Sequence, residues 1–108
     1  MTAKQQPAQV AGEAPLPVKS DRNGKIVKNY TRREWFEKIM EEVLEAHGAK
    51  SNTKTAEELT DIITVCVSYL EALGFNAQAR AEIQAKINNK NRLRGYFYDV
   101  PDYGDWKD

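Results

Sequence analysis

Residues 56–73 read AEELTDIITVCVSYLEAL, and this stretch decides the fold. Apolar side chains occupy most of its positions, and no Gly or Pro interrupts it before Gly74. The segment predicts a helix that ends near Leu73, with Gly74 as the stop signal. A helix that is apolar on nearly every side is buried on more than one side. One narrow polar stripe remains, and it could be either the floor of a polar pocket or an ordinary polar face: Asp61, Thr64 and Ser68.

Two pairs of acidic residues carry the strongest functional signal. Glu58 and Asp61 are spaced i, i+3 in this helix, and Glu42 and Glu45 have the same spacing in EEVLE, residues 41–45. Each pair therefore lies on one helical face, a turn apart. Two such helices packed together would gather four carboxylates, whose mutual repulsion favours a bound cation. Oxygen ligands select hard ions, so the pattern predicts a Mg²⁺ site, with Mn²⁺ possible, and phosphate chemistry.

The helix expected before this one has clear start and stop signals. The stretch TRRE predicts a capping box between Thr31 and Glu34. Apolar residues then recur at helical spacing until Gly48, the expected end. These residues are Trp35, Phe36, Ile39, Met40, Val43 and Leu44.

The polar connection between the two helices leaves the second cap open. Either Ser51 or Thr55 can cap the helix that follows. Thr55 would place Glu58 at the third helical position, where it could serve as a capping acid instead of a metal ligand. We favour Ser51, because it frees Glu58 and lengthens the helix.

A third helix is expected from Asn76, its predicted cap, to about Gly95. Its apolar side chains are expected to face inward at Ala79, Ile83 and Ile87. The fold class is therefore all-α: a small helical bundle with an acidic metal site shared by two helices. A domain this small is marginal alone, and its middle helix needs more cover, so we expect oligomerisation to complete the bundle.

Composition narrows the class of protein. The chain has 108 residues, with 16 Lys and Arg balanced by 16 Asp and Glu, which argues against a nucleic-acid or membrane-surface binder. A single cysteine, Cys66, excludes an internal disulfide framework. No apolar run approaches the ~20 residues of a membrane span, so we expect a cytoplasmic protein. We divide the chain into a flexible N-terminal arm (1–28), which could alternatively drape over a partner, a helical domain (29–97) and an acidic aromatic tail (98–108).

The stretches EEVLEAHGA and AEELTDIITVCVSYLEAL resemble the MazG-like, all-α nucleoside triphosphate pyrophosphohydrolases. That superfamily carries Glu-Glu-x-x-Glu on one helix and Glu-x-x-Asp on the next, as residues 41–45 and 58–61 do here. The resemblance covers roughly residues 31 to 97 and extends to the basic ending KNRLRGYF, residues 90–97. It implies Mg²⁺-dependent hydrolysis of a ribo- or deoxyribonucleoside triphosphate to a monophosphate and pyrophosphate. It also implies a homodimer or dimer of dimers, with the site built between helices of two subunits.

The resemblance assigns roles to individual residues. It makes Glu42, Glu45, Glu58 and Asp61 the metal ligands. An acidic neighbour would then be spare to activate water; Glu41 is our candidate base, and Glu57 is interpreted as a surface acid. The basic ending of the third helix would bind substrate phosphates, although cations there also suit the helix dipole. The phosphate-binding residues expected on this basis are Lys86, Lys90, Asn91 and Arg94.

The nucleobase site is predicted from aromatic residues. Trp35, one turn before the acidic motif, is the candidate for stacking on a base, although aromatics at helical spacing commonly belong to a core. Two rival functions stay open. One is a phosphoribosyl-ATP pyrophosphohydrolase of the same superfamily. The other is a non-catalytic helical interaction module whose acidic pairs form a solvated face.

Overall fold

The structure is a computed structural model that describes residues 11–97, and this range contains three α-helices and no β-strand. A short 3-10 helix, η1 (Val27–Asn29), precedes them. The all-α prediction is confirmed for this part of the chain. The tail predicted at 98–108 lies outside the described residues, as do the first ten residues of the predicted arm.

Helix α1 (Arg32–His47) begins at the predicted capping box. Thr31 accepts a hydrogen bond from the backbone N–H of Glu34, and the Glu34 carboxylate accepts one from the N–H of Thr31. The helix ends at Gly48, as the sequence predicts. Local hydrogen bonding therefore fixes where α1 begins.

Helix α2 (Asn52–Ala72) begins at Ser51, whose side chain accepts a hydrogen bond from the N–H of Lys54. The choice of Ser51 over Thr55 is confirmed, and Glu58 is left free of any capping role. The helix ends at Leu73, followed by Gly74 with a φ of 98°. That left-handed conformation is one that glycine adopts without strain.

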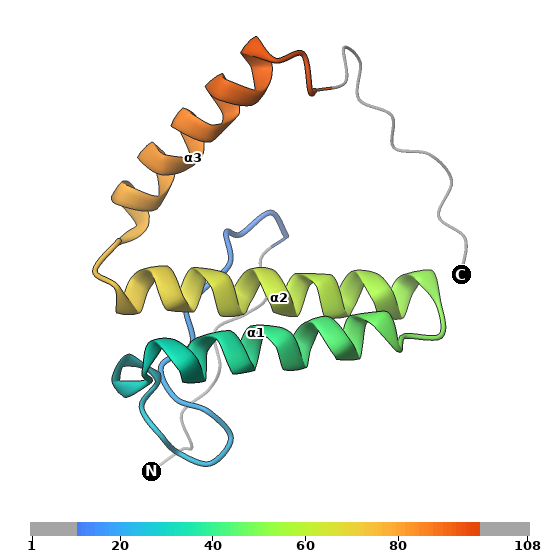
Figure 1. Ribbon diagram of the computed structural model, residues 1–108, viewed down its shortest axis with the longest axis vertical. Helices are drawn as coiled ribbons and strands as arrows, with labels where there is room; N and C mark the ends of the chain where they lie inside the picture. Colours follow the sequence, from blue (N-terminus) through green and yellow to red (C-terminus); the bar gives the residue numbers. More distant parts are fainter. Residues whose placement is uncertain (1–10, 98–108) are drawn as a thin grey trace.

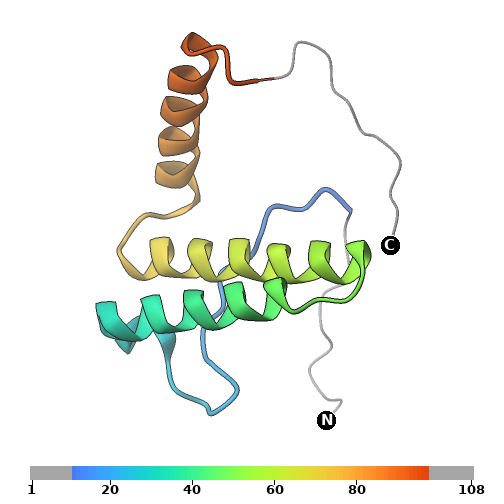
Figure 2. The ribbon, with the colours of Figure 1, turned by 45° about the vertical axis from the view of Figure 1, so that its right-hand side comes forward.

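Helices α1 and α2 lie antiparallel and side by side (Figures 1 and 2). An aromatic cluster joins them at the end where α1 begins. Trp35 is only 3% exposed and stacks on Tyr69 of α2, with ring centroids 4.9 Å apart. Tyr30 contacts Trp35 from the preceding segment, at 5.0 Å between centroids. These rings form the centre of a small core, because aromatic side chains bury the most apolar area per residue.

Helix α3 (Ala77–Leu93) turns away from this pair across a bend of 117° and stands apart from it (Figure 1). Asn76 caps it as predicted. The prediction that its apolar side chains face inward is wrong for a single chain: α3 has no buried residue, and Ile83 and Ile87 are each 39% exposed. The physical reason is that no described element of the same chain covers this helix.

The segment before α1 packs on the helix pair. The backbone N–H of Val18 donates to the buried Ser68 hydroxyl of α2 at 2.8 Å, and the Val27 side chain is buried. Such a hydrogen bond contributes about 1 kcal/mol. Residues 18–28 of the predicted flexible arm are therefore docked, because polar and apolar contacts hold them to α1 and α2.

No single helix in the described range is long and apolar enough to cross a membrane. Only α2 and α3 taken together, across their bend, meet that length and composition.

Candidate metal centre

Three of the four predicted metal ligands meet where α1 and α2 pack together. Glu42 of α1 and Glu58 and Asp61 of α2 each offer a carboxylate oxygen, and these oxygens lie within 4.8 Å of one another. The i, i+3 spacing places Glu58 and Asp61 on the α2 face toward α1. The antiparallel packing then brings Glu42 opposite them. Three carboxylates this close repel one another unless a positive charge lies among them.

Burial strengthens the case for a cation at this place. Glu42 is only 8% exposed. Oε2 of Glu58 is buried and has no hydrogen-bond partner among the described residues. A buried carboxylate oxygen without a partner is costly, because it loses its water without compensation. The donor set and this unpartnered oxygen fit a hard divalent cation.

The fourth predicted ligand lies in a second, overlapping group. Glu45 shares a cluster with Glu41 and Glu42, again with carboxylate oxygens within 4.8 Å of one another. It is not part of the group that contains Glu58 and Asp61. Its position one turn further along α1 explains this separation. Glu42 is thus the residue common to both groups.

Lys38 of α1 forms ion pairs at the edge of this centre. Its ammonium lies 3.2 Å from Oε1 of Glu42 and 3.7 Å from Oε1 of Glu41. Burial lowers the pKa of Lys38, but the hydrogen bond to Glu42 and the attraction of both carboxylates outweigh it, so its pKa is raised above the ordinary value. Lys38 therefore stays charged and offsets part of the carboxylate repulsion.

The two acids considered as a base have different surroundings. Glu41 is exposed next to the centre, with its carboxylate near Lys38. Glu57 is also exposed, but it pairs with Lys54 at 3.3 Å, as a surface acid does. Glu41 thus lies within the acidic cluster, whereas Glu57 belongs to neither carboxylate group.

The predicted phosphate-binding residues lie on α3, away from the carboxylates of the same chain (Figure 1). Arg94 is the C-terminal cap of α3, and its guanidinium lies 5.9 Å from the ring centroid of Tyr96. Lys90 lies in the last turn of the helix. A single chain therefore does not bring its basic cluster to its acidic one.

The predicted base-stacking residue belongs to the core. Trp35 contacts the rings of Tyr69 and Tyr30, and 3% of it remains exposed. In this conformation Trp35 offers no free face of the size of a nucleobase. In this conformation the Trp35 ring holds α1, α2 and the preceding segment together, and its part in binding a base stays a prediction.

A pocket that the sequence did not predict lies beside the acidic centre. It has a volume of about 440 Å³ and is enclosed by α1, α2 and residues 18–30. Arg22 and Asn23 line it from the segment, and Lys38 and Glu41 line it from α1. The position of Lys38, four residues before Glu42, could have indicated its pairing, since i, i+4 side chains meet on a helix. Arg22 lines the pocket only because residues 18–30 pack on the helix pair, which no local sequence pattern indicates.

A hydrogen-bonded turn fixes the pocket wall that the segment forms. The Tyr30 hydroxyl donates to Oδ2 of Asp21 at 2.5 Å, and Oδ1 accepts from the N–H groups of Asn23 and Lys25. The hydrogen bond to Asp21 raises the pKa of Tyr30 to about 12. The same hydrogen bond lowers the pKa of Asp21, despite the opposing effect of burial.

Comparison of the chain with protein-family models, curated proteins and solved structures found no match. The similarity to the MazG-like superfamily stays a prediction from the motifs quoted above.

Proposed function

We propose that this protein is a nucleoside triphosphate pyrophosphohydrolase that depends on Mg²⁺ or Mn²⁺. It would cleave a ribo- or deoxyribonucleoside triphosphate to the monophosphate and pyrophosphate. The observation that carries the proposal is the group formed by Glu42, Glu58 and Asp61, together with the buried, unpartnered oxygen of Glu58. The motifs at residues 41–45 and 58–61 support the choice of substrate.

Glu42, Glu58 and Asp61 would hold the cation, with Glu45 as a further ligand beside them. A bound divalent ion supplies electrostatic stabilisation to the charge that develops on phosphate oxygens during hydrolysis. Glu41 lies next to these ligands and is exposed, so it can accept a proton from water. Lys38 pairs with Oε1 of Glu42 and would keep its carboxylate oriented.

The basic residues of α3 would bind substrate phosphates that belong to the site of a second copy. Two observations support an assembly of this kind. The α3 helix lies apart from the carboxylates of its own chain (Figure 1). Large apolar side chains on α1 and α2 are exposed, which a second copy would cover: Phe36, Met40, Leu44, Leu59 and Ile63.

The same exposed apolar side chains favour the rival of another class, a non-catalytic helical interaction module. The two functions differ in their response to metal. Mg²⁺ or Mn²⁺ should raise the melting temperature of the enzyme, because the folded state alone holds the ion. The melting temperature of an interaction module would not change.

The test of the proposed function is a screen of ribo- and deoxyribonucleoside triphosphates with Mg²⁺, in which pyrophosphate release is measured. We expect release with at least one substrate and none when the metal is chelated. Phosphoribosyl-ATP belongs in the same screen, because turnover of this compound alone would favour the rival within the superfamily. Absence of turnover with every substrate would contradict the proposal.

A further inference from the structure

The pocket between residues 18–30 and the helix pair has an apolar part of its lining, here called the floor, and a charged part, here called the rim. Its apolar lining comes from Val18, Val27, Trp35 and Val65. Its volume of about 440 Å³ lies within the range of small-molecule sites, roughly 300 to 1,000 Å³. An inorganic phosphate would leave most of this volume empty, so the shape fits a larger, partly apolar ligand.

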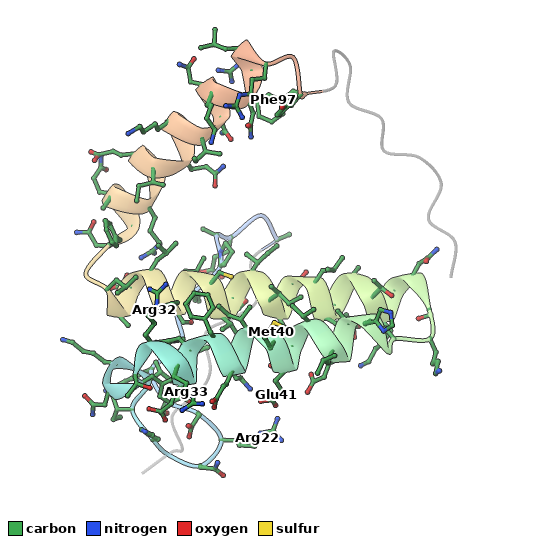
Figure 3. All side chains as sticks on the ribbon, in the orientation of Figure 1. Arg22, Arg32, Arg33, Met40, Glu41 and Phe97 are labelled. Carbon is green, nitrogen blue, oxygen red and sulfur yellow. The ribbon has the colours of Figure 1, made fainter. Side chains whose placement is uncertain are left out.

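Two cations, Arg22 and Lys38, belong to the rim. Arg22 forms no ion pair with any carboxylate of the described residues, and it lines the same pocket as Glu41, which Figure 3 also labels. Lys38 is the second cation, and it contacts both Glu41 and Glu42. Lys38 and Glu41 therefore link the pocket to the acidic centre.

We propose that this pocket binds the nucleoside end of the substrate, with Arg22 and Lys38 on the phosphate nearest the sugar. The proposal rests on the proposed function, since it takes the ligand to be the same nucleotide. A base would lie on the apolar floor, within reach of the Asn23 amide. The phosphate chain would then pass the two cations and reach Glu42 and its neighbours.

The chemistry of the two cations suits this role. A guanidinium presents a planar fork that can donate two parallel hydrogen bonds to one phosphate. Within residues 11–97, Arg22 has no carboxylate partner to release first. Lys38 already lies beside Glu42 and would contact both the phosphate and the carboxylate. Both cations thus favour an anion at the rim, whereas the acidic centre next to them favours a metal cation.

The wall that carries Arg22 is held in place before any ligand binds. Asp21 is fixed by Tyr30, Lys25 pairs with Glu34 at 2.7 Å, and Val18 is bound to Ser68. A wall fixed in this way loses little conformational entropy on binding. Residues 18–30 would thus serve as a preformed wall of the nucleoside pocket.

The test is calorimetric titration of the full chain, in the presence of Mg²⁺, with nucleoside triphosphate analogues of the common bases in which an imido group replaces the oxygen between the α- and β-phosphates. We expect Arg22→Gln to weaken binding of the preferred analogue by about tenfold, the effect of losing charge-assisted hydrogen bonds. Arg33→Gln is the matched control, because Arg33 is exposed on α1 and pairs with Glu37 outside this pocket. It should bind the analogue like the wild type. Inorganic pyrophosphate should bind more weakly than the analogue, since it leaves the apolar floor empty.

Unchanged affinity in Arg22→Gln would overturn the proposal and leave the proposed function standing. Pyrophosphate that binds as tightly as the analogue would also overturn it, because the pocket would then be a plain phosphate site. No binding of any analogue by the wild type would contradict both proposals. Binding that depends on Arg22, in a protein that releases no pyrophosphate, would support the pocket and contradict only the hydrolysis.

Discussion

Glu42 of α1 and Glu58 of α2 bring carboxylate oxygens within 4.8 Å of each other across the packed helix pair. Glu42 has a cationic partner, Lys38, whereas no ion pair to Glu58 is present in the described part of the chain. The two carboxylates are thus incompletely neutralised by the protein itself. The remaining repulsion between the carboxylates should lower the stability of the metal-free protein.

Replacing Glu58 by Gln should stabilise the metal-free protein and remove its response to metal. Relief of like-charge repulsion at this distance contributes about 1 kcal/mol, or several degrees in melting temperature for a domain of this size. Thermal unfolding in chelator and then in Mg²⁺ measures both effects. Glu57→Gln is the matched control. Glu57 is the acid next to Glu58 in the sequence, but it is exposed and pairs with Lys54. If both variants respond to Mg²⁺ like the wild type, Glu58 is not a ligand.

The docked segment should be released in acid through Asp21. The pKa of Asp21 is lowered from 3.8 in the folded protein, mainly by the hydrogen bond from Tyr30. A carboxylate whose pKa is lowered on folding stabilises the folded protein at pH values above its unfolded-state pKa. This stabilisation is lost as the pH falls through the folded-state pKa. The stability difference between wild type and Asp21→Asn should therefore be constant from about pH 7 to 5 and shrink below about pH 4. Urea denaturation at each pH measures the difference. A difference that does not change down to the lowest pH would contradict this role of Asp21.

Assembly should depend on the exposed apolar face of α1. Leu44 is 67% exposed in one chain, so Leu44→Lys should leave the helices folded and shift the protein from dimer or tetramer toward monomer. Analytical ultracentrifugation at micromolar concentration, with circular dichroism, measures both properties. Leu16→Lys is the control, because Leu16 is 61% exposed but lies before the helices. A wild type that sediments as a stable folded monomer would contradict the expected assembly.

Arg94→Lys should reduce turnover about tenfold and leave Mg²⁺ binding intact, because a lysine keeps the charge and loses the two-pronged hydrogen bond. Asn91→Ala should act in the same direction but more weakly. Arg92→Lys is the matched control, since Arg92 contacts the Phe97 ring near the same helix end. Steady-state kinetics compare the three variants. Wild-type kinetics for Arg94→Lys and Asn91→Ala would mean that phosphates are bound elsewhere.

The position of α3 adds a second test of Arg94. If α3 acts in the site of a partner copy, mixing inactive Asp61→Ala and Arg94→Ala proteins should restore part of the activity, because one site of the mixed dimer keeps both residues. If each active site takes both Asp61 and Arg94 from the same chain, mixing the two variants would restore no activity.

The sequence predicts the parts of this fold that depend on neighbouring residues. Thr31, Ser51 and Asn76 cap the three helices as predicted, because each cap is made by hydrogen bonds within one turn. The i, i+3 spacing of the acids likewise predicts which side chains share a face. What the spacing alone could not predict is that Glu45 groups with Glu41 rather than with Asp61, since this depends on how far α1 overlaps α2.

The sequence fails where a contact is distant along the chain. Residues 18–30 lack apolar periodicity, and they are held by single contacts such as the hydrogen bond from Val18 to Ser68, fifty positions later. Ile83 and Ile87 have the spacing of an inward face, yet the surface that would cover them is not provided by the described part of their own chain. Trp35 has an aromatic ring of the kind that stacks on a nucleobase. In the folded chain this ring lies in the core, where Tyr69 of α2 stacks on it.

The most direct test of the metal-dependent hydrolysis is pyrophosphate release from Mg²⁺–nucleoside triphosphate by wild type and by Asp61→Ala. Asp61 is exposed, so its removal should leave the helices intact, as circular dichroism would verify. We expect release by the wild type and a loss in the variant larger than the roughly 10- to 100-fold typical of changes that only support a metal ligand. Full activity in a folded Asp61→Ala protein would contradict the assignment of these carboxylates.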